Sequence, residues 1–251
     1  MNHATHSFII STIAGLTTLI GALIIFIKSD KRNNIICSSL SFSAGVMIAI
    51  SIFDLIPTSF KYLSDTYNII PAMLVVSLFT IIGIIISFFI SKLIPEKKED
   101  NNNLFRTGIL SMIVLMLHNI PEGIATFITS MNDITFGITI ALAISLHNIP
   151  EGISIAVPIY YSTNSKLKPF IYTFIAGISE LFGAMLTYKF LYPYMNDLIL
   201  SFLFAIIGGL MIHIAISELL PSANRYGSIN KIIKEVIYAA ILMLICHYLL
   251  H

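Results

Sequence analysis

Residues 107–129 read TGILSMIVLMLHNIPEGIATFIT, an apolar stretch that carries one histidine and one glutamate near its centre. Its length matches the ~20 apolar residues that a helix needs to cross a bilayer. The seven residues HNIPEGI at 118–124 recur without change at 147–153. An identical repeat of this length predicts two copies of one structural element, each inside its own apolar helix.

The composition of the whole chain is that of a membrane protein. Of 251 residues, 57% are apolar and only 11% are charged, whereas soluble domains carry about 25% charged residues. The net charge of +1 gives no basic surface for nucleic acid, so no nucleic-acid partner is expected. Cys37 and Cys246 lie far apart inside apolar runs and predict neither a disulfide nor a thiolate metal site.

Apolar runs separated by short polar connections predict an all-α integral membrane protein with eight transmembrane helices. No stretch between them is long enough for a soluble domain, so residues 1–251 form a single transmembrane domain. The expected spans are residues 8–27, 35–58, 69–93, 107–129, 135–160, 169–191, 198–220 and 231–250.

The basic residues fall almost entirely on one side of this arrangement. Lys and Arg prefer the cytoplasmic side of a membrane, so both termini are expected outside the cell, with the protein in the plasma membrane. Only Lys61 and Lys189 fall on the side of the termini. The opposite side holds Lys28, Lys31, Arg32, Lys92, Lys97, Lys98, Arg106, Lys166, Lys168, Arg225, Lys231 and Lys234.

A second, weaker repeat links the second and seventh spans. Residues 45–58 read GVMIAISIFDLIPT and residues 209–222 read GLMIHIAISELLPS. The two spans cross the membrane in opposite directions, which indicates an inverted repeat. We therefore expect a 3+2+3 arrangement, with spans 4 and 5 as an antiparallel hairpin between two related halves. Inverted repeats suit alternating access in carriers.

The repeated motif places histidine and glutamate on one face of each helix. Residues four apart share a helix face, so His118 projects with Glu122, and His147 with Glu151. Both pairs, and Glu180 in span 6, fall near the middle of a ~30 Å core. Asn119 and Asn148 follow the histidines and can reach an adjacent position.

Three glutamates at this depth are costly, and spans 4, 5 and 6 offer no Lys or Arg at that depth as partners. Imidazole and carboxylate groups suit zinc and its first-row neighbours. A metal site therefore accounts for the acids. The metal-site candidates are His118, Asn119, Glu122, His147, Asn148, Glu151 and Glu180.

Three further residues are weighed as pathway candidates, and a fourth residue, His213, is not one of them. Asp54 and Glu218, toward the ends of spans 2 and 7, are either entrance and exit ligands or interfacial acids. Met47 is a candidate pathway residue, although methionine more often fills a core. His213, inside span 7, is expected to be a hydrogen-bonded core histidine.

The duplicated motif and the 3+2+3 plan resemble the ZIP (Zrt/Irt-like) family of metal transporters, in its prokaryotic zinc-uptake branch. The resemblance covers essentially the whole chain. It implies a binuclear site bridged by Glu122 and Glu151, a homodimer, and an elevator-like movement of spans 1, 4, 5 and 6. It implies no prosthetic group, with Zn²⁺ as the transported substrate. Iron, manganese, cobalt and cadmium remain open as further substrates, because carboxylate-rich sites discriminate poorly.

Two other functions use the same ligands. An intramembrane metallohydrolase would activate water on the metal, and a metal sensor would bind without transport. The hydrolase does not account for the inverted repeat or for the duplicated motif. The sequence therefore favours a carrier that is not an enzyme.

Overall fold

A computed structural model describes residues 3–26, 31–65, 67–94 and 100–250, and in these ranges it is built from helices. Lys28, Lys97 and Lys98, which contributed to the predicted sidedness, lie outside the described residues. The α-helices are α1 His3–Leu16, α2 Thr18–Ala22, α3 Arg32–Ile50, α4 Ile56–Ser64, α5 Ile69–Leu93, α6 Asp100–Asn132, α7 Ile134–Thr163, α8 Leu167–Leu186, α9 Asp197–Ile214, α10 Leu220–Asn224 and α11 Ile229–Leu250. Short 3₁₀ or π-helical turns continue some of them: η1 Leu23–Phe26, η2 Ser51–Leu55, η3 Thr187–Leu191 and η4 Ala215–Leu219.

Seven helical stretches of the described chain are long and apolar enough to cross a membrane. They correspond in order to the first seven predicted spans, and the eighth predicted span is also a single helix, α11, of 22 residues. The expectation of a helical multi-pass membrane protein is therefore met. The seven stretches are His3–Phe26, Arg32–Ser64, Ile69–Leu93, Asn103–Asn132, Ile134–Thr163, Leu167–Leu191 and Asp197–Asn224.

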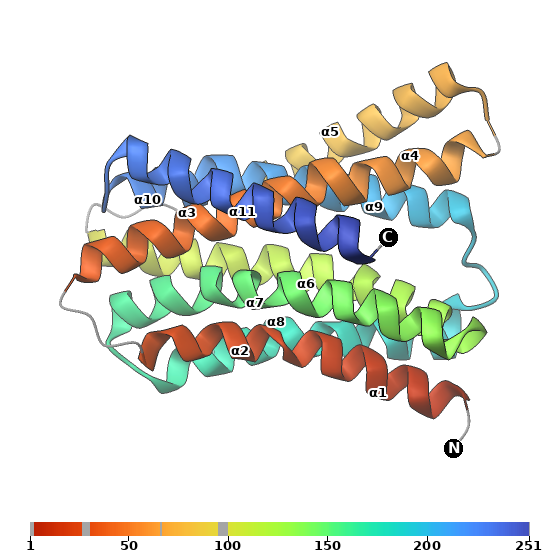
Figure 1. Ribbon diagram of the computed structural model, residues 1–251, viewed down its shortest axis with the longest axis horizontal. Helices are drawn as coiled ribbons and strands as arrows, with labels where there is room; N and C mark the ends of the chain where they lie inside the picture. The colour runs from red at the N-terminus through yellow and green to blue at the C-terminus, as the bar shows by residue number, and fades with distance from the viewer. Residues whose placement is uncertain (1–2, 27–30, 66, 95–99, 251) are drawn as a thin grey trace.

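The helices run roughly along the long axis of the molecule and form two groups (Figure 1). In the site group, α1, α2, α6, α7 and α8 pack against one another. In the flanking group, α3 packs on α11, and α9 packs on α4 and α5. Contacts of α3 with α7 and of α6 with α9 join the two groups. The four residues of the duplicated motif that carry chemistry thus lie in the site group, against its border with the flanking group.

The chain reverses direction at each connection, so alternate connections lie at the same end of the molecule (Figure 1). We call one end the basic end, because most described Lys and Arg residues lie in or beside its connections. It is the end where α3 and α6 begin, on the left of Figure 1. The opposite end holds the turn between α6 and α7, in which Asp133 caps α7 by accepting hydrogen bonds from two backbone N–H groups.

Several predicted span boundaries are wrong in detail. The second and seventh spans continue past Pro57 and Pro221, because a π-helical turn precedes each proline and leaves it in the first turn of a new helix. The helix that contains the fourth span begins at Asp100 and its apolar stretch at Asn103, rather than at residue 107, which brings Arg106 into the helix. The first span begins at His3 and is interrupted at Thr17 between α1 and α2.

Glycines allow the helices of the site group to touch backbone to backbone. A Cβ atom on Gly123 of α6 would lie 1.9 Å from the carbonyl oxygen of Glu180 on α8. A Cβ atom on Gly152 of α7 would lie 2.0 Å from the carbonyl oxygen of Thr18 on α2. Small residues serve this purpose in membrane helix packing. Both motif glycines thus lie where two helices approach closely.

We expect Gly123→Ala to lower the stability of the folded protein by about 1–3 kcal/mol, because α6 and α8 must separate to admit the methyl group. Gly208→Ala is the matched control. Its nearest neighbour is the flexible Ile56 side chain, at 3.1 Å. Thermal unfolding of the purified proteins in detergent measures the difference. Equal melting temperatures for the two variants would contradict this account of the packing.

Candidate metal centre

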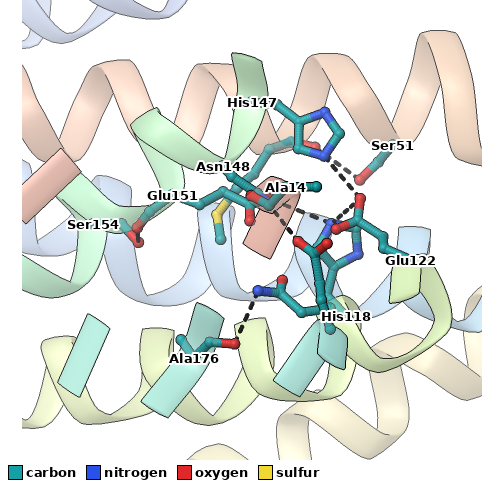
Figure 2. Close-up of polar contacts among 12 residues, drawn as sticks. Ala14, Ser51, His118, Glu122, His147, Asn148, Glu151, Ser154 and Ala176 are labelled. Carbon is teal, nitrogen blue, oxygen red and sulfur yellow. Dashed lines mark hydrogen bonds and ion pairs between the residues drawn. The ribbon is translucent and has the colours of Figure 1, made fainter. Parts of the chain in front are cut away.

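The two copies of the repeated motif face each other across α6 and α7. Oε1 of Glu122 lies 2.8 Å from Nε2 of His147 and 3.1 Å from Nε2 of His118. Oε1 of Glu151 lies 3.4 Å from the same nitrogen of His118. Figure 2 shows the Glu122 carboxylate directed toward the imidazole of His147. The structure thus brings together the four side chains that the i, i+4 spacing predicted.

This cluster has the dimensions and burial of a metal site. One ligand atom each from His118, His147 and Glu151 lies within 4.8 Å of the others. All four side chains are at most 6% exposed. One metal ion can reach several donors at ~2.0–2.2 Å with small side-chain movements.

Asn119, Asn148 and Glu180 form a second set on the side of α1 and α8. Asn148 donates a hydrogen bond of 2.5 Å to Oε1 of Glu180 and another of 3.0 Å to the carbonyl of Ala14. Asn119 donates to the carbonyl of Ala176, 3.0 Å away. All three side chains are fully buried.

Several buried oxygens of this region have no hydrogen-bond partner among the residues that the structure describes. A buried acceptor without a partner costs free energy, and a carboxylate costs more. A cation would offset that cost, since each of these oxygens has lone pairs to donate. They are Oδ1 of Asn119 and of Asn148, Oε2 of Glu122, both carboxylate oxygens of Glu151, and Oε2 of Glu180.

The contacts around the centre occur in equivalent pairs. Asn119 bonds to Ala176 of α8, and its repeat counterpart Asn148 bonds to Ala14 of α1. Likewise, the motif glycine of α6 meets the backbone of α8, and that of α7 meets the backbone of α2. Gly15 of α1 and Gly177 of α8 also pack against each other. A Cβ atom on Gly15 would lie 2.2 Å from the carbonyl oxygen of Gly177, and one on Gly177 would lie 2.4 Å from the carbonyl oxygen of Gly15. The first and sixth spans therefore make matching contacts to the two motifs.

A cavity of about 160 Å³ leads from the cluster toward the opposite end. Glu122 and His147 line its deep part, and Asp54, Thr58 and Tyr62 line it along η2 and α4. The cavity lies between the site group and the flanking group. A carboxylate and a hydroxyl therefore line this cavity together with the cluster residues Glu122 and His147.

The other two pathway candidates, Glu218 and Met47, and the histidine His213 lie in different surroundings. Glu218 is not in this cavity. Its Oε2 lies 2.5 Å from a guanidinium nitrogen of Arg106, toward the basic end. Met47 is fully buried in the hydrophobic core. Nδ1 of His213 lies 2.8 Å from Oγ of Ser87, so the histidine is hydrogen-bonded as expected, although it is only partly buried.

Two features of this region were missed from the sequence. The predicted fourth span begins one residue after Arg106, and an arginine next to an apolar helix start was the available signal. The interruption of the first span at Thr17 has no proline beside it, and Gly15, two positions earlier, was the available signal. It lies beside Ala14, whose carbonyl accepts hydrogen bonds from Asn148 and from the backbone and hydroxyl of Thr17. An interrupted helix beside a buried polar cluster is typical of membrane carriers.

Comparison with known proteins identifies a family to which this chain is similar. Residues 95–245 match the sequence profile of a family described as "ZIP Zinc transporter". The chain is also similar to proteins named "Zinc transporter ZupT". For that of Streptococcus mutans the identity is 38%, covering 96% of each chain. For that of Clostridium perfringens it is 35%, covering 97% of this chain and 95% of the relative. For that of Oceanobacillus iheyensis it is 35%, covering both chains completely.

Proposed function

This chain belongs to the ZIP family of zinc transporters, and we propose that it carries a divalent transition-metal ion, zinc above all, across the cell membrane into the cytoplasm. The observation that carries the proposal is the buried cluster in which Glu122 lies between His118 and His147. The relatives are named transporters, which favours a carrier over a metallohydrolase or a sensor. Zinc is the substrate here and not a resident cofactor.

We propose a binuclear centre at this point. His118, His147, Glu122 and Glu151 supply nitrogen and oxygen ligands to one ion. The unpartnered oxygens of Asn119, Asn148 and Glu180 support a second ion beside it. The remaining oxygens of Glu122 and Glu151 can bridge the two positions. Carboxylate bridges of this kind let two cations approach without full mutual repulsion.

We propose the 3+2+3 inverted repeat as the architecture of one transmembrane domain. The paired contacts of the first and sixth spans with the two motifs support it. So do η2 and η4, which occupy matching places in the repeat between the second and seventh spans. The gathering of basic residues supports a cytoplasmic basic end, with both termini outside. The family resemblance supports a homodimer and a movement of the site group against the flanking group.

The number of zinc ions bound per chain tests the proposed binuclear centre. We expect the purified wild-type protein to bind about two zinc ions per chain, and Glu180→Gln to bind about one, because the amide removes the carboxylate charge of the second position. Equilibrium dialysis with metal analysis measures both. Ser179→Ala is the matched control, since its hydroxyl bonds to the carbonyl of Ala176 on its own helix. One zinc ion per chain in both wild type and Glu180→Gln would contradict the binuclear centre.

A further inference from the structure

Arg106 makes three polar contacts between the two helix groups near the basic end, where Arg32 of α3 also bonds to the carbonyl of Tyr161 on α7. The Arg106 guanidinium bonds to Glu218 at 2.5 Å and to the backbone carbonyls of Ser91 at 2.9 Å and Ile94 at 2.5 Å. Arg106 belongs to α6 of the site group, whereas its three acceptors belong to η4, α5 and the residue that follows α5 in the flanking group. One side chain therefore ties a helix of the metal centre to two elements of the other group.

Arg106 and Glu218 line a cavity of about 420 Å³, and buried side chains lie between them and the metal centre. The side chains of Arg106 and Glu218 are only 11% and 10% exposed. In the next position, the hydroxyls of Thr107 on α6 and Ser222 on α10 lie 2.7 Å apart and fully or nearly buried. Ser111, one turn further toward the centre, has no exposed surface. The cavity that reaches Glu122 and His147 lies on the other side of the centre, toward the opposite end.

The two related acids of the weaker repeat thus have different partners. Asp54 in η2 lines the open cavity, where its closest polar contact in the structure is the Thr58 hydroxyl at 3.3 Å. Glu218 in η4 bonds to a guanidinium that is fixed on the site group. If the site group moves against the flanking group, Arg106 must leave Glu218, and the acid then faces the pathway. The Glu218 carboxylate thereby loses the Arg106 guanidinium and becomes free to coordinate a metal ion.

We propose that Arg106 and Glu218 form a latch that holds the basic end closed while the metal centre is open to the opposite end. Arg106 is a positioning residue in this role: it acts as a tethered cation that occupies Glu218 until the site group moves. Breaking such a pair by removing one partner is strongly unfavourable for the state that contains it. The proposal rests on the proposed transport function, because a latch between alternating states has no use in a static binding protein.

A cysteine at Ser111 reports on the closed end. Ser111 shares a face of α6 with Thr107 and His118 by helical spacing, and its hydroxyl has no hydrogen-bond partner among the described residues. Ser111→Cys would be placed in a Cys37→Ser/Cys246→Ser background. A membrane-impermeant maleimide is then applied to inside-out vesicles, and the labelling rate is measured without added metal. A second reporter, Thr58→Cys in the same background, lines the open cavity and is labelled in right-side-out vesicles.

We expect Arg106→Gln and Glu218→Gln each to raise the labelling rate of the Ser111→Cys reporter about tenfold and to lower that of Thr58→Cys, because the population shifts toward the state open at the basic end. The double variant should label no faster than the single variants, since both charges of one pair are gone. Arg106→Lys should stay close to wild type. Lys92→Gln is the matched control: Lys92 lines the same cavity as Glu218, with its ammonium group over the Phe88 ring.

Several outcomes overturn the latch: wild-type labelling in both single variants, or equal acceleration in Lys92→Gln. A rise at both reporters would indicate general loosening and would also overturn it, since a latch predicts opposite changes. Labelling requires no metal transport. The latch and the proposed function can therefore fail separately. If no zinc enters, the labelling experiment still tests the latch. If labelling is unchanged in the variants, the zinc-entry experiment still tests transport.

Discussion

Glu122→Ala and Glu151→Ala are each expected to reduce zinc uptake at least about a hundredfold, to the level of vesicles without protein. Loss of groups that merely support metal ligands costs ~10–100-fold, and these carboxylates are themselves placed as ligands. Glu122 contacts both imidazoles of the centre, and Glu151 contacts His118. Removing either one also leaves two histidines with less negative charge to attract a divalent cation. Uptake of radioactive zinc into cells or proteoliposomes measures the effect.

His213→Ala provides the control for this prediction. His213 is a potential metal ligand by its chemistry, but it lies on α9 of the flanking group and bonds to Ser87. We expect it to retain most of the uptake. Normal uptake in either glutamate variant would contradict the site, and loss of uptake in His213→Ala would show that the substrate path includes a histidine outside the cluster.

The second large effect is expected from His118→Ala/His147→Ala. Removing both nitrogen ligands should weaken zinc binding at least about a hundredfold, because the remaining carboxylates suit harder cations better than zinc. The two imidazole centroids lie 6.1 Å apart, so both rings border the same small volume. Zinc binding to the purified protein in detergent measures this without any need for transport. Wild-type affinity in the double variant would place the ion elsewhere.

The sequence was sufficient for the parts of the account that depend on local periodicity. The i, i+4 spacing placed His118 with Glu122 and His147 with Glu151, and the antiparallel hairpin predicted for spans 4 and 5 put both pairs at one depth. The structure brings Glu122 within 2.8 Å of His147, on the neighbouring helix. Long apolar runs predicted the order of the long helices, because a bilayer requires that length, and seven of the eight predicted spans correspond to stretches of the described chain that are apolar and long enough to cross a membrane.

The parts that depend on tertiary partners could not be predicted in this way. Arg106 bonds to Glu218, which lies 112 positions further along the chain, and no periodicity links the two. The interruption at Thr17 has only a weak local signal, Gly15 two positions earlier, since glycine is frequent within transmembrane helices. The extra length of α6 was also missed: its first residues, beginning at Asp100, are polar, and hydropathy marks the membrane core rather than the end of a helix.

Zinc entry into sealed proteoliposomes tests the central claim most directly. The purified protein is reconstituted with a fluorescent zinc chelator trapped inside, and wild type is compared with His118→Ala/His147→Ala. The account predicts fast entry in wild type and entry no faster than empty vesicles in the double variant. Wild-type protein that binds zinc yet admits none above empty vesicles would contradict transport and favour a sensor or a hydrolase.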